Sequence, residues 1–122
     1  MDAQPPVANL LVIRSPDIDH AVTFYQAMGM VFDRHAHGKG PEHYASEVGG
    51  FVFEIYPQRN DQDVTTNTRI GFNVDDVDGI VETLRKLDSE ILAEPRDSQW
   101  GRRAVLKDFD GHTLELVTPA RQ

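Results

Sequence analysis

One amphipathic helix pattern occurs twice in this sequence, and this repeat limits the possible folds more than any other feature. Apolar residues first stand at the spacing of one buried helix face at Ile18, Ala21, Val22, Tyr25 and Met28. The same steps recur 59 residues later at Val77, Ile80, Val81, Leu84 and Leu87. The flanking acids also correspond, because Asp17 and Asp19 match Asp76 and Asp78. The chain is therefore predicted to contain two copies of one structural unit.

Both predicted helices carry start signals, but only the first has a glycine stop. For the first helix we expect Ser15 as the N-cap, Pro16 at the first helical position and Gly29 just beyond the end. The second helix is expected to begin at Asp75-Asp76 and to end near Asp88, where no glycine is available.

A strand candidate precedes each helix and three more follow it. They are residues 10–14, 30–34, 43–47 and 51–56 in the first half, and 69–74, 91–94, 103–107 and 113–117 in the second. The order is βαβββ twice, with units of about 8–57 and 68–118, a polar linker at 58–67 and one domain over 7–118. We predict an α+β fold in which two tandem units form a curved mixed-sheet cup with the helices on its outer face.

Strand alternation assigns the side chains of the first strand in each unit to the two faces. The cup-facing set is Leu10, Val12 and Arg14 in the first unit and Arg69, Gly71 and Asn73 in the second. The helix-facing set is Leu11 and Ile13, then Ile70, Phe72 and Val74. The helix-facing set is uniformly apolar, which is what a buried face requires.

Composition excludes several classes of protein. The chain has 122 residues, 12 Lys+Arg, 20 Asp+Glu and no cysteine, which favours one domain without disulfides or thiolate metal sites. A net charge of −8 disfavours nucleic acid and anionic membranes as partners. No apolar stretch reaches the roughly 20 residues that cross a bilayer, and the start of the sequence does not read as a signal peptide, so we expect a cytoplasmic protein. Motifs for serine hydrolases, phosphate loops and dinucleotide binding are missing from the sequence.

Several segments together resemble the vicinal oxygen chelate superfamily, which includes glyoxalase I, bleomycin-resistance proteins, fosfomycin-modifying enzymes and extradiol dioxygenases. The segments are Ser15-Pro16-Asp17, Phe24-Tyr25, Met28-Gly29, Trp100-Gly101-Arg102, Asp108-Phe109-Asp110-Gly111-His112 and Leu114-Glu115-Leu116. The resemblance covers residues 8–118 and implies the predicted fold, but it does not imply one reaction.

Metal-dependent members of this family place ligands on the first and last strand of each unit. Carried over, the last-strand positions fall on Glu54 and Glu115, and the first-strand positions fall on Leu10 and Arg69. Neither Leu10 nor Arg69 can bind a metal. A register shifted by one residue would place Asn9 and Thr68 there, but it would turn Arg69 toward the helix. We therefore expect no cofactor, with Glu54 and Glu115 as the residual candidates for a divalent metal.

Other side chains are candidates for ligand binding. His43 is expected to face the cup as an acid–base or ligand-binding group, which makes Glu54, Glu115 and His43 the catalytic candidates. Arg14 and Arg69 are candidates for substrate contacts, and Trp100 is either a lid or a dimer contact. His35 and His37 are interpreted as loop histidines rather than as a metal pair, and His112 as a structural residue.

Two classes of function fit these residues. The first is a bleomycin-resistance-like protein that binds a small organic molecule in an acid-lined cup without a full metal site. The alternative is a metal-dependent glyoxalase-like lyase or isomerase, or a dioxygenase. The resemblance also implies a homodimer. In place of a metal, we expect the Arg69 guanidinium to bond both Glu54 and Glu115, so that Arg69→Leu would be strongly destabilising.

Overall fold

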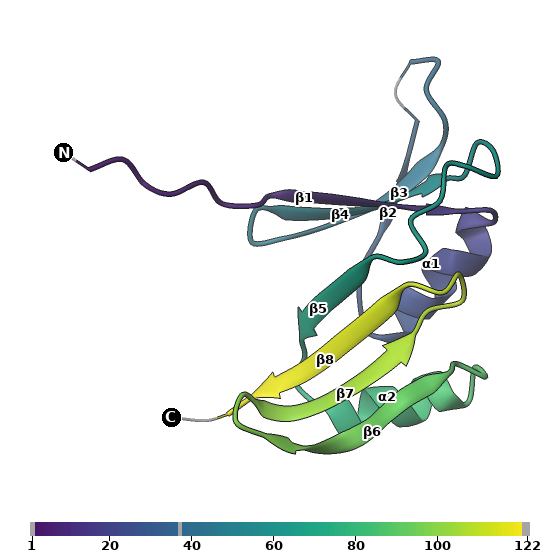
Figure 1. Cartoon of the computed structure of the whole chain (residues 1–122). Helices are drawn as coiled ribbons and strands as arrows, with labels where there is room; N and C mark the ends of the chain where they lie inside the picture. Colours follow the sequence, from purple (N-terminus) through teal and green to yellow (C-terminus); the bar gives the residue numbers. More distant parts are fainter. Residues whose placement is uncertain (1, 37, 121–122) are drawn as a thin grey trace.

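The computed structural model describes residues 2–36 and 38–120, which form two units of one helix and one four-stranded sheet each (Figure 1). The first unit contains β1 (Leu10–Ser15), α1 (Ile18–Ala27), β2 (Asp33–His35), β3 (His43–Val48) and β4 (Phe51–Pro57). The second contains β5 (Arg69–Asn73), α2 (Val77–Arg85), β6 (Ile91–Ser98), β7 (Gly101–Lys107) and β8 (Thr113–Pro119).

The two sheets have the same topology. Their strand orders are β1-β4-β3-β2 and β5-β8-β7-β6. In each, the first strand pairs parallel with the last, and the other pairs are antiparallel. The predicted α+β fold of two tandem βαβββ units is confirmed. The predicted cup surface is divided between two separate sheets.

The first helix begins two residues later than the sequence signals suggested, and the second begins where they suggested. Asp17 is the N-cap of α1 and accepts the His20 N–H at 3.1 Å, and Asp76 caps α2 by accepting the Gly79 N–H at 3.0 Å. The prediction of Ser15 as N-cap and Pro16 as first helical residue is therefore wrong. Ser15 ends β1, and its hydroxyl accepts the Asp17 N–H. Both residue types are good caps, so their order alone does not decide between them.

The helix ends repeat one cap geometry with different residues. Gly29 has φ +102° after α1, and Asp88, its equivalent 59 residues later, has φ +62° after α2. The next residue closes the turn in both units, because Met30 N–H donates to Tyr25 O and Ser89 N–H donates to Leu84 O, each at 3.2 Å. No helix in the part of the chain that the structure describes is long and apolar enough to cross a membrane.

The helix-facing sides of the two sheets share one core. Ile13, Phe53 and Ile55 of the first sheet are buried in the same cluster as Ile70, Leu114 and Leu116 of the second. Tyr25 of α1 lies in this cluster, with its ring centroid 4.9 Å from Phe53, and the Phe53 and Phe72 centroids are 5.8 Å apart. By alternation, the opposite faces of both sheets turn away from the shared core.

A chain of hydrogen bonds runs through the contact between the units. The Tyr25 hydroxyl donates to Asp108 Oδ2 at 2.5 Å, and His112 Nδ1 lies 2.8 Å from the same oxygen. His112 Nε2 is 2.6 Å from Thr65 Oγ1, which accepts the Arg14 N–H at 2.9 Å. The ionised Asp108 carboxylate can only accept, so His112 Nδ1 is the donor in their contact. The chain connects α1, the β7–β8 turn, the linker and β1.

We predict that Tyr25→Ala lowers the free energy of unfolding by about 3–5 kcal/mol, because it empties a fully buried aromatic site and removes a donor to Asp108. Gln26→Ala, at an exposed position on the same helix, is the control and should be near neutral. Urea unfolding followed by circular dichroism measures both. Equal effects of the two substitutions would contradict the assigned buried face.

Candidate functional site

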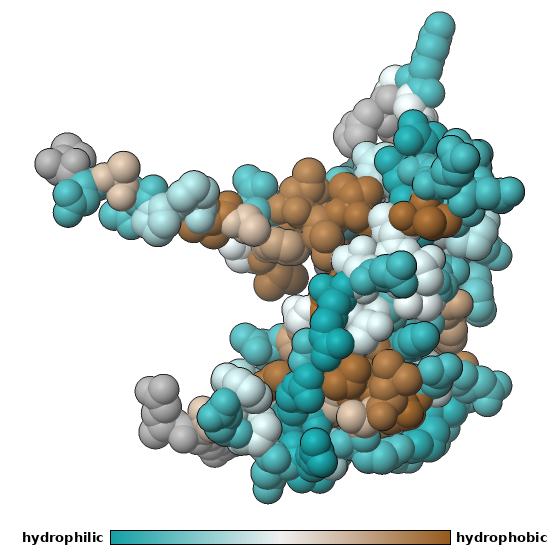
Figure 2. Space-filling model, viewed as in Figure 1, coloured by the Kyte–Doolittle hydropathy of each residue, from teal (hydrophilic) through white to brown (hydrophobic). Residues whose placement is uncertain are grey.

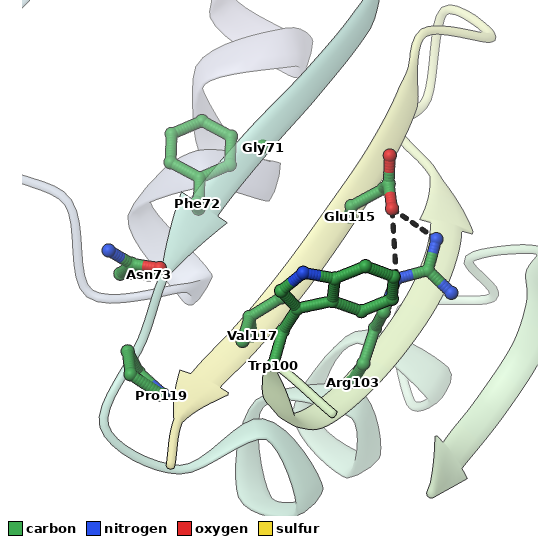
Figure 3. Close-up of a pocket in the computed structure, with 8 residues that line it drawn as sticks. All are labelled: Gly71, Phe72, Asn73, Trp100, Arg103, Glu115, Val117 and Pro119. Carbon is green, nitrogen blue, oxygen red and sulfur yellow. Dashed lines mark hydrogen bonds and ion pairs between the residues drawn. The ribbon is translucent and has the colours of Figure 1, made fainter. Parts of the chain in front are cut away.

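The outward face of the second sheet carries a carboxylate, Glu115, held between the guanidinium groups of Arg69 and Arg103, of which Figure 3 shows that of Arg103. Arg69 Nε on β5 donates to Glu115 Oε2 on β8 at 2.6 Å. Arg103 on β7 donates to Glu115 Oε1, from Nε at 2.9 Å and also from its terminal Nη2. Gly71 is the register partner of Glu115 on β5, and nothing lies within 4 Å of where its Cβ would be. The strand beside Glu115 therefore leaves open space above the sheet.

The two arginines set the protonation of Glu115. Hydrogen bonds from Arg69 and then Arg103 lower the pKa of the Glu115 carboxyl to about 2. Glu115 is therefore ionised at neutral pH. With two guanidinium groups and one carboxylate, this cluster carries a charge of +1.

A pocket of about 630 Å³ lies beside this cluster. Its lining residues are Gly71, Phe72, Asn73, Trp100, Arg103, Glu115, Val117 and Pro119. The Trp100 indole is mostly exposed and lies in front of Val117 and next to Arg103 (Figure 3). The tight β6–β7 turn fixes the backbone of Trp100. Its backbone N–H donates to Ser98 Oγ, and its backbone carbonyl accepts the Ala120 N–H. Trp100 thus forms a flat, accessible wall of the pocket.

Glycine is required next to Trp100. Gly101 has φ +129°, and a Cβ there would lie 2.1 Å from the Thr118 carbonyl oxygen. Any other residue would strain the turn and push β7 away from β8. The Trp100-Gly101 pair therefore fixes the position of the indole over the sheet.

The first sheet carries a different polar cluster on its outward face. His43 on β3 is 2% exposed, and its Nε2 lies 3.3 Å from Glu54 Oε2 on β4. The His43 ring stacks on Tyr56 with 4.1 Å between centroids and 8° between planes. The Arg14 guanidinium lies 5.2 Å from the Tyr56 ring centroid. His43 therefore faces the cup side, as expected, but it is covered rather than open to a ligand.

Arg14 is held by the chain itself. Its Nε lies 3.7 Å from Asp63 Oδ1 of the linker, and its Nη1 donates to the Pro57 carbonyl at 3.4 Å. The cup-facing Arg14 therefore stabilises the start of the linker. His35 lies on β2 rather than in a loop, 5.7 Å from the His43 ring, and His37 falls outside the described residues.

The structure brings together only part of the predicted site. Arg69 bonds Glu115 as expected, but its second predicted partner, Glu54, belongs to the other sheet and pairs with His43. The shared core explains this separation, because it turns the two carboxylates away from each other's unit. Arg103 provides the second ion pair of Glu115 instead. The cluster is also more exposed than expected, since the Arg69 side chain is 56% accessible.

The donor set at these positions does not fit a divalent metal. On the adjacent first strand of each unit, the residue paired with Glu54 is Val12 and the residue paired with Glu115 is Gly71. Neither has a side-chain atom that binds a metal. Leu10 has no donor atom, and Arg69 is a cation already bonded to Glu115. Within residues 2–36 and 38–120, no group of three or more His, Asp or Glu side chains is placed to hold a metal.

Two features were missed by the sequence analysis. Arg103 lies in a predicted strand, but the sequence alone was not used to assign its side chain to a face of the sheet. Strand alternation was a usable signal, because the adjacent Ala104 is buried and Arg103 therefore points to the opposite face. The second feature is a series of contacts from Thr65 to His112 to Asp108, which has the hydroxyl–imidazole–carboxylate order of a hydrolase triad. No sequence motif indicates these contacts. Thr65 Oγ1 accepts the Arg14 backbone N–H, so this arrangement connects the linker to β1 and serves structure.

Comparison with protein families gives a match over most of the chain. The model of the Glyoxalase/Bleomycin resistance protein/Dioxygenase superfamily matches residues 8–116. A protein of Mycolicibacterium smegmatis described as uncharacterized is 23% identical over 113 residues, which cover 93% of this chain and 94% of that protein.

Solved structures show the same fold. The oxidase ChaP-H2 has a TM-score of 0.75 and 21% identity, and the match covers 96% of each chain. TnmS3, an antibiotic binding protein from Streptomyces sp. CB03234, has a TM-score of 0.71 and 22% identity, covering 98% of this chain and all of that one. A glyoxalase I mutant from Zea mays has a TM-score of 0.73 and 21% identity, covering 93% of this chain and 45% of that one.

We predict that Glu115 titrates with a pKa of about 2 and that Arg69→Gln raises this value toward the ordinary 4.5. The folded-state pKa is depressed, so the stabilising pairs persist above the ordinary pKa and are lost only as pH falls through about 2. Carbon-13 NMR of the glutamate carboxyls measures both. Arg85→Gln, which removes a distant arginine paired with Glu94, is the control. A parent midpoint near 4.5 would contradict the cluster.

The exposure of Arg69 also changes the expected stability of its variants. We predict that Arg69→Leu alters the free energy of unfolding by about 1 kcal/mol or less, because a solvent-exposed ion pair contributes about that much. Arg103 still neutralises Glu115 in this variant. Urea unfolding at neutral pH measures the change. A loss of about 3–5 kcal/mol would instead indicate a buried pair.

Proposed function

Because the family model matches nearly all of it, the chain belongs to the Glyoxalase/Bleomycin resistance protein/Dioxygenase superfamily, and we propose that it binds a small organic molecule without using a metal ion. The Arg69–Glu115–Arg103 cluster is the observation that carries this proposal. It places a fixed positive charge next to the carboxylate that would otherwise be available to a metal. The protein then needs only a shaped, partly apolar pocket.

The pocket walls suggest the chemistry of the ligand. Trp100 offers an exposed aromatic face, and Val117 and Pro119 add apolar surface. Arg103 offers a guanidinium, and its cluster has a charge of +1. We therefore propose a planar aromatic ligand with a carboxylate or another anionic acceptor group. This differs from the acid-lined cup expected from the sequence, because the arginines neutralise Glu115.

The overall charge of the protein does not oppose such a ligand at short range. The net charge is −8, but physiological salt screens charges beyond about 8 Å, so the local arginines dominate in the pocket. The fold of TnmS3, which is described as an antibiotic binding protein, is consistent with a binding role. The donor set of residues 2–36 and 38–120 does not support a metal-dependent lyase, isomerase or dioxygenase.

Trp100 is the only tryptophan in the sequence, so its fluorescence reports directly on the pocket. We predict that 2-naphthoate quenches this fluorescence saturably and binds at least about tenfold more tightly than 2-naphthalenemethylamine, its cationic counterpart. Arg103→Gln should weaken 2-naphthoate binding by at least about tenfold, since charge-assisted hydrogen bonds contribute about 1.5–3 kcal/mol. Isothermal titration calorimetry confirms the affinities.

Arg85→Gln is the matched control, because Arg85 pairs with Glu82 and Glu94 and does not line the pocket. It should bind 2-naphthoate like the parent. Equal affinity for the anionic and cationic compounds would overturn the proposed ligand class. Binding that requires added Zn²⁺, Ni²⁺ or Mn²⁺ and disappears with a chelator would overturn the metal-free site.

A further inference from the structure

The outward face of the second sheet is positively charged, although the protein as a whole is acidic. Strand register and alternation place on this face the side chains of Arg69, Arg96, Arg103, Lys107 and Glu115. Four cations and one carboxylate give the face a charge of +3, whereas the net charge of the chain is −8. The other acids of these strands, Glu94 and Asp97, pair with Arg85 and Arg102 on the helix side.

Two of these cations are direct cross-strand neighbours. Arg96 on the edge strand β6 is the register partner of Arg103 on β7. Directly opposed side chains of antiparallel strands point to the same face, with Cβ atoms about 4.5–5.5 Å apart, and like charges in this position are destabilising. The fold therefore keeps a pair of arginines where repulsion between them opposes its stability.

The next pair of the same hairpin shows the opposite arrangement. Asp97 and Arg102 are also register partners, and Arg102 Nη1 lies 3.2 Å from Asp97 Oδ1. Arg102 is bonded to Asp78 of α2 as well. On the helix side the hairpin thus offsets its arginine with carboxylates, and on the outward side it sets one arginine against another.

Both outward arginines retain donors for an anion. Glu115 bonds Arg103 from the β8 side, through Nε and Nη2. Within residues 2–36 and 38–120, Arg103 Nη1 makes no hydrogen bond, and the exposed Arg96 has no carboxylate partner. Each guanidinium has five N–H donors in a planar fork. An anion between the two side chains would receive charge-assisted hydrogen bonds from both strands and would relieve their repulsion.

We infer that Arg96 and Arg103 form a clamp for a dianionic phosphate group, so that the ligand of the neighbouring pocket is a planar aromatic phosphate. This inference rests on the proposed function, in which the Trp100 pocket takes the aromatic ring. A carboxylate would offset one charge of the face. A phosphate monoester carries about −1.5 to −2 at pH 7 and has three acceptor oxygens, which suit two arginine forks.

The positions of the ring and the phosphate are compatible within one hairpin. Arg96 lies two residues before the end of β6, and Arg103 lies two residues after the start of β7. Trp100 lies in the turn between these strands, and its indole is next to Arg103 (Figure 3). A ring against the indole therefore directs its phosphate substituent toward the two arginines.

Two probes of the same shape test the preference for a dianion. 2-Naphthyl phosphate and 2-naphthyl sulfate have the same ring and three terminal oxygens, but at pH 8 the phosphate is a dianion and the sulfate a monoanion. Isothermal titration calorimetry at pH 8 should show that the phosphate binds at least about tenfold more tightly. Equal affinities would overturn the clamp.

Arg96→Gln tests the residue that the proposed function does not use. It should weaken binding of 2-naphthyl phosphate by at least about tenfold and that of 2-naphthoate by about threefold or less, because a single carboxylate can remain on Arg103. Lys86→Gln is the matched control, since it removes one exposed positive charge at the end of α2 and should bind both compounds like the parent. Unchanged phosphate affinity of Arg96→Gln would contradict the inference.

The unfolding of the same variant provides a measurement without ligand. The urea midpoint of Arg96→Gln should be equal to or above that of the parent, because the substitution removes a like-charge pair. A lower midpoint would show that Arg96 stabilises the fold through a partner of its own, and it would overturn the clamp.

The three compounds separate this inference from the proposed function. Saturable binding of 2-naphthoate without a preference for the phosphate overturns the clamp and leaves the proposed function standing. If none of the three binds, both are overturned.

Discussion

The relative placement of the two units depends on one buried carboxylate, Asp108. It accepts the Tyr25 hydroxyl from the first unit and both the ring and the backbone N–H of His112 from the second. Burial works to raise the pKa of Asp108, but the hydrogen bonds from His112 and Tyr25 outweigh it and hold the pKa below its ordinary value. An ionised group inside the protein is tolerated only because these donors replace water. The contact between the units is therefore directional as well as apolar.

This placement determines which residues can form a site. Because the helix-facing sides of both sheets meet in one core around Tyr25 and Phe53, the outward faces carry their polar groups separately. Glu54 therefore pairs with His43 on one sheet, and Glu115 pairs with arginines on the other. The covered His43 leaves little for a ligand to contact. The second sheet, with open space at Gly71 and an exposed Trp100, offers the better pocket.

The sequence predicted what is local and repeated. The 59-residue offset located both helices, and alternation correctly assigned Ile13 and Ile70 to the buried face. The Arg69–Glu115 contact was also predicted, because the resemblance places both residues at equivalent ligand positions of the cup, and the pairing of β5 with β8 brings them together. Periodicity shows that a face is buried but not what it is buried against, so the separation of Glu54 from Glu115 could not be predicted. The Thr65–His112 contact joins residues 47 apart through a linker without periodicity, so no local pattern indicated it.

The pocket is connected through β5 with a groove of about 1180 Å³, which residues of both sheets line and which Figure 2 shows as a hollow between the two units. Gly71, Phe72 and Asn73 line both cavities, so one strand forms a wall of each. Since β8 is the one strand with which β5 pairs in the described part of the chain, the position of β5 depends on the groove side as well as on the sheet. The Phe72 ring packs against Phe53 on the groove side, whereas Gly71 leaves open space beside Glu115 on the other side of the strand. A substitution that moves β5 on the groove side therefore also changes the space beside Glu115 and Trp100.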